Sequence, residues 1–320
     1  MKKFFSFCIL LILVNLAAKA QQEPLFSGYM LSRPITNPGF VGAENTINAL
    51  FLNRTMFAGI GEGKPVTSVF GVEAPVEILG TNSGLGVWVV SDELGFYSTV
   101  NVDFVYAYHH QLENGVLGAG IKGGFNNFSI NPEEWIYVDE SHSNDPLIPS
   151  QFSTIIPGFG LGIYYQTPTY YLGFSASQIN SADIIYSGQG QTEYNVGYMA
   201  PQYYLTGAYN IALPDPLFDL QPSFLLRTDL AAYVLDINGT VYYKNKYWTG
   251  FGLRMSPRNI AAFNLMGGLE LFNGLSVGYI LDVNLGAMFL GGHTSHEIMV
   301  SYSFNLDTKR DQRYKSVRYL

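Results

Sequence analysis

The stretch Thr99–Tyr108 (TVNVDFVYAY) decides the fold class of this 320-residue chain. Successive side chains of a β-strand point to opposite faces, so every second residue shares a face. One face would carry Val100, Val102, Phe104, Tyr106 and Tyr108, and the other Thr99, Asn101, Asp103, Val105 and Ala107. An apolar face with aromatic ends, opposite a mostly polar face, is typical of a strand that crosses a membrane in a β-barrel.

Four further segments repeat this alternation, within residues 117–125, 159–166, 218–227 and 235–243. Short turn signals separate such segments; Glu113-Asn114-Gly115, for example, contains an Asn-Gly pair that tolerates the positive φ of a tight hairpin. The pattern predicts about fourteen strands, at 46–56, 65–78, 83–91, 97–111, 115–126, 155–166, 169–178, 202–211, 218–227, 230–243, 247–255, 260–271, 275–283 and 294–304. An even number is expected, because a closed barrel leaves no edge strand in lipid.

The connections between the predicted strands are of two kinds. Most are short turns, whereas residues 126–153 and 180–201 read as long polar loops. Outer-membrane barrels have short periplasmic turns and longer extracellular loops. No apolar run after residue 20 is long enough for a membrane helix. The sequence therefore predicts an all-β, antiparallel transmembrane barrel over residues 46–304.

Composition separates this prediction from a soluble β-sandwich or soluble barrel, whose strands also alternate. Charged residues make up 13% of the chain and aromatic residues 15%, with 34 glycines. A soluble domain usually carries about 25% charged residues. Few charges with many tyrosines and phenylalanines are expected where one strand face meets lipid and tyrosines lie at the membrane boundary. We therefore favour the membrane barrel.

Residues 1–20 have the three parts of a secretory signal peptide. Lys2 and Lys3 are followed by a mostly apolar run from Phe4 to Leu16, and Ala18-Lys19-Ala20 supplies a small-x-small cleavage pattern. We expect export through the Sec pathway and cleavage between Ala20 and Gln21. The alternative is a transmembrane anchor, but the apolar run is shorter than the ~20 residues that a spanning helix needs.

The mature chain would contain no thiol, because the only cysteine, Cys8, lies in the signal peptide. This excludes disulfides, thiolate metal sites and cysteine nucleophiles. Of the 17 lysines and arginines, three lie in residues 1–20, which leaves 14 against 25 acidic residues and a net charge of −11. A chain this acidic is not expected to bind nucleic acid.

The two ends of the mature chain carry more specific motifs. Residues 21–30 read QQEPLFSGYM and residues 37–42 read NPGFVG. Near the other end, Gly278-Tyr279 precedes Asp282, and Ser295-His296-Glu297-Ile298 enters a last strand that ends Ser301-Tyr302-Ser303-Phe304. These motifs resemble those of the PorP/SprF family of type IX secretion membrane proteins. Thr55-Met56 departs from the family pattern, which has Gln-Trp after the arginine at this point.

The resemblance implies an outer-membrane barrel associated with type IX secretion or gliding, which helps to export a large adhesin-like protein or to hold it at the cell surface. Its implied partners are such a secreted protein, periplasmic or outer-membrane secretion components, and outer-membrane lipid. We expect a signal peptide (1–20), a periplasmic or plug-like segment (21–45), the barrel (46–304) and a basic tail (305–320).

Motifs that suggest catalysis or cofactor binding lack the context that such sites need. Residues 118–123 match G-x-G-x-x-G but lie in a predicted strand that no helix follows. His296-Glu297 lacks the second histidine of a zinc protease, since position 300 is valine. His109 and His110 are adjacent, so on a strand they point to opposite faces. No G-x-S-x-G elbow occurs. We expect no enzyme activity, no cofactor and no metal site.

Two charged regions are candidate partner contacts. The acidic loop at 133–145 contains Trp135, Tyr137, Asp139 and Glu140. It reads either as a solvated loop or as a surface for a protein partner or calcium. The tail contains Lys309, Arg310, Arg313 and Lys315. It reads either as a disordered end or as a contact to a periplasmic secretion component.

Other functions remain open at this point. The main alternative is an outer-membrane channel or transporter for small solutes, which a conductance measurement would distinguish from an anchor. A membrane lipid hydrolase is a third reading and would require a serine-dependent activity.

Overall fold

The computed structural model describes residues 23–44, 46–131, 151–187, 193–257, 259–272, 274–285 and 294–305. Three short helices, η1 (Tyr29–Leu31), α2 (Arg33–Thr36) and η2 (Pro38–Phe40), precede the strands. The strands are β1 (Thr46–Thr55), β2 (Val66–Ile78), β3 (Thr81–Leu94), β4 (Tyr97–Leu112), β5 (Gly115–Ile130), β6 (Phe152–Gln166), β7 (Tyr170–Ser177), β8 (Ala182–Ser187), β9 (Glu193–Met199), β10 (Gln202–Tyr209), β11 (Ile211–Ala212), β12 (Phe218–Thr228), β13 (Tyr233–Tyr243), β14 (Tyr247–Ser256), β15 (Asn259–Phe272), β16 (Leu275–Asn284) and β17 (Thr294–Asn305). Over the described residues, no helix has the length and apolar character to span a membrane.

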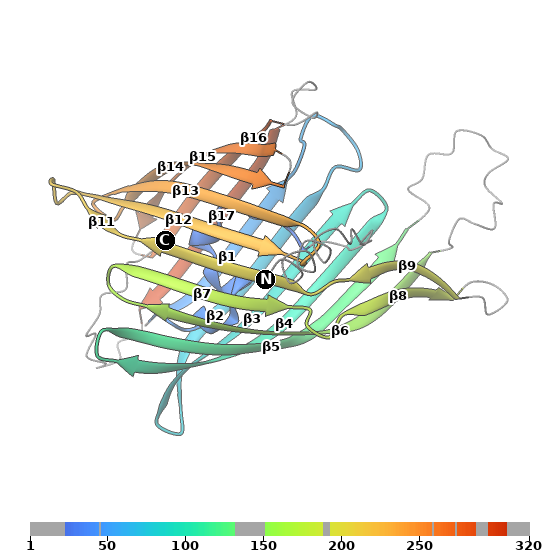
Figure 1. The fold of residues 1–320 in the computed structure, drawn as a ribbon, viewed down its shortest axis with the longest axis horizontal. Coiled ribbons are helices and arrows are strands. Elements are labelled where there is room, and N and C mark those ends of the chain that lie inside the picture. The colour runs from blue at the N-terminus through green and yellow to red at the C-terminus, as the bar shows by residue number, and fades with distance from the viewer. Residues whose placement is uncertain are drawn as a thin grey trace, which may run out of the picture.

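The strands form a closed antiparallel barrel of fourteen strands, as the alternation predicts (Figure 1). Neighbours in sequence pair around most of the ring, and β1 pairs with β17 from Thr46↔Asn305 to Thr55↔His296. Strand β10 pairs with both β7 and β12, which closes the ring where the hairpin β8–β9 leaves it. Closure gives each of the fourteen strands a hydrogen-bonded neighbour on both sides, as the apolar interior of a bilayer requires.

Residues Thr99–Tyr108 lie in β4, and their side chains point to the two faces that the alternation predicts. Phe104 exposes 58% of its surface on the outside, whereas Asp103 and Val105 are buried in the lumen. The same division holds for β5, where Ile121 is exposed and Lys122 points inward to the ion pair with Asp103. The apolar outer faces therefore form the surface that meets lipid.

The barrel has two unlike ends. We call the short-turn end the one that holds the tight turn at residues 113–114, the beginning of β1 and the end of β17. The long-loop end holds the connections from β1 to β2, from β5 to β6 and from β7 to β10.

The prediction of a loop over residues 180–201 was wrong in part, because β8 and β9 form a two-stranded hairpin there. Its base packs on the barrel: Ile184 is completely buried against a cluster that contains Phe128, Ile130 and Ile156. The predicted loop 126–153 is likewise shorter, since β5 continues to Ile130 and β6 begins at Phe152. Apolar contacts at the long-loop end extend the ordered sheet past the boundaries that local alternation suggests.

Candidate functional site

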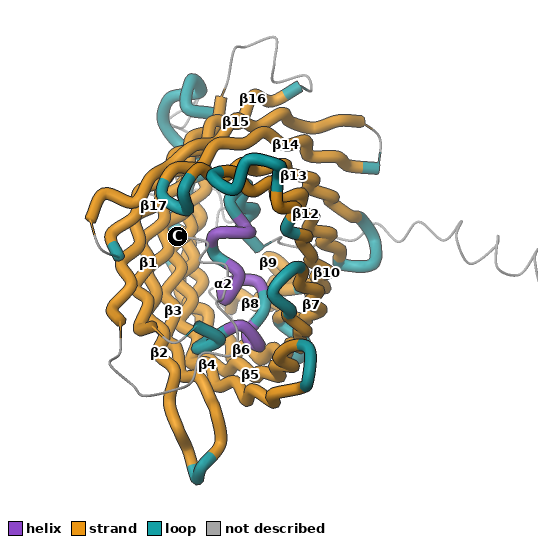
Figure 2. Tube along the Cα trace, turned by 90° about the vertical axis from the view of Figure 1, so that its left-hand side faces the viewer, coloured by secondary structure: helices purple, strands orange, loops and turns teal. Residues whose placement is uncertain are grey.

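The lumen contains the N-terminal segment (residues 23–44), whose short helices lie inside the ring of strands (Figure 2). Glu23 is beside Tyr204 and Arg227, which lie near the long-loop ends of β10 and β12. The chain then crosses the lumen and reaches β1 at the short-turn end. The sequence predicted a periplasmic or plug-like segment here, and the described residues lie within the barrel.

Five ionised side chains from five strands form a buried cluster around Arg54, which we call the charge cluster; they are Arg54, Asp236, Arg254, Asp282 and Glu297. The Arg54 guanidinium pairs with Asp282 at 2.5 Å and with Glu297 at 2.9 Å. Arg254 pairs with Asp236 at 2.8 Å. Buried charges are tolerated only when they are paired and hydrogen-bonded, so each member depends on the others.

The N-terminal segment supplies Ser27 to the middle of this cluster. The Ser27 hydroxyl donates to Asp282 at 2.8 Å and accepts from Arg54 and Arg254 at 3.2 and 3.0 Å. The backbone N–H groups of Ser27 and Gly28 each donate to the Glu297 carboxylate at 3.0 Å. The strands thus hold the segment through charge-assisted hydrogen bonds, which are stronger than neutral ones.

The position of Gly28 explains why the backbone comes so close to Glu297. A Cβ atom at Gly28 would lie 2.7 Å from Ile280 Cδ1 and 2.8 Å from Glu297 Oε1, so both side chains would have to shift to accommodate it. Ser27 and Gly28 belong to the first terminal motif, and Asp282 and Glu297 belong to the last. Two motifs about 270 positions apart therefore form one site.

Next to the cluster, Tyr29 is buried in the lumen, and its hydroxyl lies 3.1 Å from that of Ser223. Burial raises the pKa of the Tyr29 phenol well above its ordinary value, so the phenol remains neutral. It thus adds a neutral hydrogen bond between η1 and β12.

Closer to the short-turn end, the N-terminal segment is held by aromatic packing and a capped turn. Phe40 stacks on Tyr164 with ring centroids 4.0 Å apart and meets the edge of Tyr171 at 5.5 Å. Asn37 accepts from the Gly39 N–H at 2.9 Å and donates to the Ile163 carbonyl at 2.9 Å. We call this the aromatic attachment.

Inward-facing glycines let the segment's backbone lie directly on the strands. A Cβ at Gly120 would lie 2.4 Å from the Pro38 carbonyl carbon and oxygen, and one at Gly84 would lie 1.9 Å from the Val41 oxygen. This identifies the role of the G-x-G-x-x-G match at residues 118–123: it lies in β5 and supports the segment's backbone.

The histidine motifs have structural contacts. His109 points inward and its Nε2 lies 2.9 Å from the Val41 oxygen, whereas His110 is exposed on the opposite face. His296 lies beside the Tyr279 hydroxyl on the outer face, at 2.6 Å. Glu297, which the sequence placed in a terminal motif and in an incomplete zinc-protease motif, is a central member of the charge cluster.

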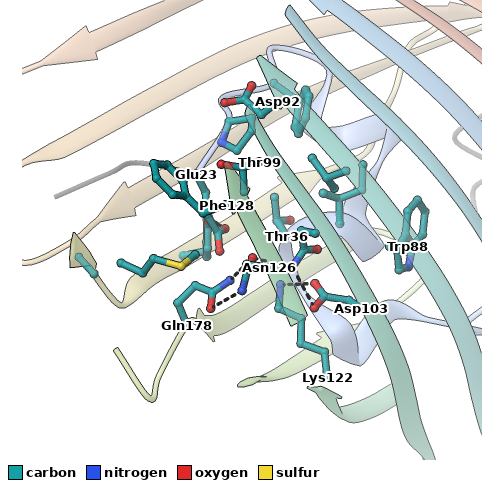
Figure 3. Close-up of a pocket in the computed structure, with 18 of the residues that line it drawn as sticks. Glu23, Thr36, Trp88, Asp92, Thr99, Asp103, Lys122, Asn126, Phe128 and Gln178 are labelled. Carbon is teal, nitrogen blue, oxygen red and sulfur yellow. Dashed lines mark hydrogen bonds and ion pairs between the residues drawn. The ribbon is translucent and has the colours of Figure 1, made fainter. Parts of the chain in front are cut away.

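A cavity of about 560 Å³ remains between the N-terminal segment and the inner faces of β3, β4 and β5 (Figure 3). Its lining is mixed. Phe26, Trp88 and Phe128 contribute apolar surface, and the Lys122–Asp103 ion pair, 3.0 Å long, lies along another wall. Figure 3 shows Asn126 and Gln178 facing each other across one side, joined by reciprocal hydrogen bonds.

The candidate partner contacts lie outside the described residues; they are Trp135, Tyr137, Asp139, Glu140, Lys309, Arg310, Arg313 and Lys315. The predicted cleavage position between Ala20 and Gln21 lies outside them as well. Sequence reasoning did not single out the contacts of Ser27 with Arg54 and Asp282, although it quoted Ser27 and Asp282 in the terminal motifs.

Residues 18–302 match the model of the family described as "Type IX secretion system membrane protein PorP/SprF". This chain belongs to the PorP/SprF family. The match begins before the first terminal motif and ends at residue 302 within the last strand, so the charge cluster and the aromatic attachment lie within the family region of this PorP/SprF protein. No curated protein matches the chain.

Solved structures that resemble this PorP/SprF protein are outer-membrane barrels. One is titled "CymD monoaromatic hydrocarbon channel", with a TM-score of 0.52 and 11% identity, covering 92% of this chain and 96% of the other. Another is the Ralstonia pickettii toluene transporter TbuX, with a TM-score of 0.46 and 9% identity over 85% of this chain and 92% of the other. At such identities the likeness concerns the fold alone.

Proposed function

We propose that this PorP/SprF protein helps to export a large secreted adhesin-like protein, or anchors it at the outer membrane, by binding and without catalysis. The observation that carries the proposal is the occupied lumen, which residues 23–44 cross between the charge cluster and the aromatic attachment. A pore for hydrophilic solutes needs a water-filled lumen. A barrel filled by its own chain is better suited to be a membrane-embedded support for another protein.

We place the partner surface at the long-loop end, on the hairpin β8–β9. The buried Ile184 fixes the base of the hairpin, while Ile185 and Tyr198 expose 46% and 36% of their surface. Exposed apolar and aromatic side chains on a well-packed support are favourable centres for protein interfaces. The acidic loop around Trp135 and the tail around Arg310 stay predicted partner contacts.

The test is recovery of the secreted partner from cells that contain a type IX system. Affinity-tagged wild-type protein should co-purify with a large secreted protein, and Ile185→Asp should reduce its recovery by about tenfold, because a charge would be buried in the interface. Leu230→Asp is the matched control: Leu230 is 78% exposed in the β12–β13 connection at the same end. Equal recovery with Ile185→Asp and wild type would refute the hairpin surface.

Conductance separates the anchor from the channel. Purified wild-type protein in a planar bilayer should give no steady, large open-state current, because the segment is held at both attachments. A steady large current, together with no co-purifying secreted protein, would favour the solute channel and refute the proposal.

A further inference from the structure

The cavity beside the N-terminal segment has features of a small-molecule site that the anchoring role does not need. Its lining includes Met199 at the end of β9 but neither Ile185 nor Tyr198, the exposed residues proposed to contact the protein partner. The N-terminal segment borders the cavity on one side and β3, β4 and β5 on the other (Figure 3). Its volume of about 560 Å³ is within the ~300–1,000 Å³ range of sites for drug-sized ligands.

Most polar groups of the lining already have hydrogen-bond partners: the acids Glu23 and Asp92, for example, accept from Tyr204 and Thr67. Lys122 is bound to Asp103 at 3.0 Å, Asn101 donates to Asn126 at 2.9 Å, and Gln178 donates to Asn126 at 3.2 Å. A charged ligand would have to separate these pairs or enter without a counter-charge, and both cost free energy in a buried site.

The apolar part of the lining, in contrast, gains most from a ligand. Phe26, Trp88, Val105 and Phe128 line the cavity, together with the partly buried Ile35 and Val90. Apolar surface that faces a cavity lacks contacts on that side, so an apolar guest restores dispersion contacts and removes the surface from water.

We propose that this cavity binds an uncharged, predominantly apolar small molecule, such as an aromatic or alicyclic hydrocarbon with at most one hydroxyl or carbonyl group. The ligand lies between β3–β5 and the N-terminal segment, in contact with Phe26 and Ile35 of the segment. The site can be tested separately from the protein-partner function, because its lining contains neither Ile185 nor Tyr198 of the hairpin.

Two fluorescent probes of the same skeleton test the selectivity. N-phenylnaphthylamine is uncharged, and anilinonaphthalene sulfonate adds a negative charge to the same rings. Purified full-length mature protein in lipid nanodiscs should give a saturable signal with the uncharged probe, above that of empty nanodiscs, and about tenfold weaker binding of the sulfonate. Equal saturation by both probes, or no signal beyond empty nanodiscs, would overturn the proposal.

Paired substitutions on two strands locate the probe. Val90→Trp fills the cavity and should weaken binding of the uncharged probe by about tenfold, because the indole occupies its volume. Val89→Trp, on the outer face of the same strand, should bind like wild type. Heat-dependent migration in gel electrophoresis checks that each variant has formed a barrel.

A second pair keeps the test decisive where Val90→Trp does not form a barrel. Thr99→Phe, at the edge of the cavity on β4, should also weaken binding, and Val100→Phe on the lipid face should not. Unchanged binding in a folded Val90→Trp or Thr99→Phe variant would place the probe elsewhere and refute the site.

Discussion

Around Ser27 the N-terminal segment is held by ionised side chains, whereas around Phe40 it is held by stacked rings and by backbone packed on glycine. The first attachment consists of interdependent charges, so loss of one member leaves another buried without a partner. The second consists of many small dispersion contacts, which are lost gradually. The difference predicts that single substitutions have larger effects in the charge cluster than at the aromatic attachment.

A single introduced thiol can measure how firmly the segment is held. Ser32 lies in the segment between the two attachments and is 1% exposed. Ser32→Cys places a thiol there in a mature chain that has no other, since Cys8 lies in the predicted signal peptide. Its labelling rate by a polar maleimide reports opening of the segment, as hydrogen exchange reports local unfolding.

The largest effect is expected for Arg54→Ala, which leaves Asp282 and Glu297 without their shared cation. Breaking a buried pair costs about 3–5 kcal/mol, so labelling of the Ser32→Cys reporter should accelerate at least about a hundredfold. Arg54→Lys, which keeps the charge but lacks the planar fork, should give an intermediate rate. A wild-type rate in Arg54→Ala would show that the cluster does not hold the segment.

Ser27→Ala should have the next largest effect, because the hydroxyl bonds with Asp282, Arg54 and Arg254. Hydrogen bonds to charged groups contribute about 1.5–3 kcal/mol, so the labelling rate should rise by about ten- to a hundredfold. Ser301→Ala is the control, since the buried Ser301 hydroxyl has no hydrogen-bond partner among the described residues. Equal rates in the two variants would contradict the role of Ser27.

Gly120→Ala tests the close approach between β5 and the segment. Its Cβ would meet the Pro38 carbonyl at 2.4 Å, and such overpacking costs about 1–3 kcal/mol. Gly123→Ala, on the outer face of the same strand, would meet only Phe159 at 3.6 Å and should leave the rate unchanged. Equal acceleration of labelling by both substitutions would contradict the role of the Gly120–Pro38 contact and indicate a general loss of stability of β5.

Phe40→Leu should have the smallest effect. It keeps an apolar side chain but removes the ring contacts with Tyr164 and Tyr171, which contribute about 0.5–1.5 kcal/mol beyond buried area. The labelling rate should therefore rise by about two- to tenfold. Phe51→Leu, on the lipid face of β1, is the control. An effect larger than that of Arg54→Ala would reverse the comparison between the two attachments.

Most of the barrel could be predicted because strand alternation is local. The predicted segment 97–111 compares with β4 at Tyr97–Leu112, and 247–255 with β14 at Tyr247–Ser256. The hairpin β8–β9 could not be predicted in this way. Its strands are six and seven residues long, and Ile184 is fixed by contacts with Phe128 and Ile156, which are distant in sequence.

The sequence by itself determined the alternating strands, the lipid-facing residues and the terminal motifs, because these depend on residue type at short spacing. Only the tertiary structure decided that Ser27 lies between Arg54, Asp282 and Glu297, and that Gly120 supports Pro38. The physical reason is barrel closure. Pairing of β1 with β17 joins chain ends more than 200 residues apart, and no local pattern specifies which inward-facing side chains then meet.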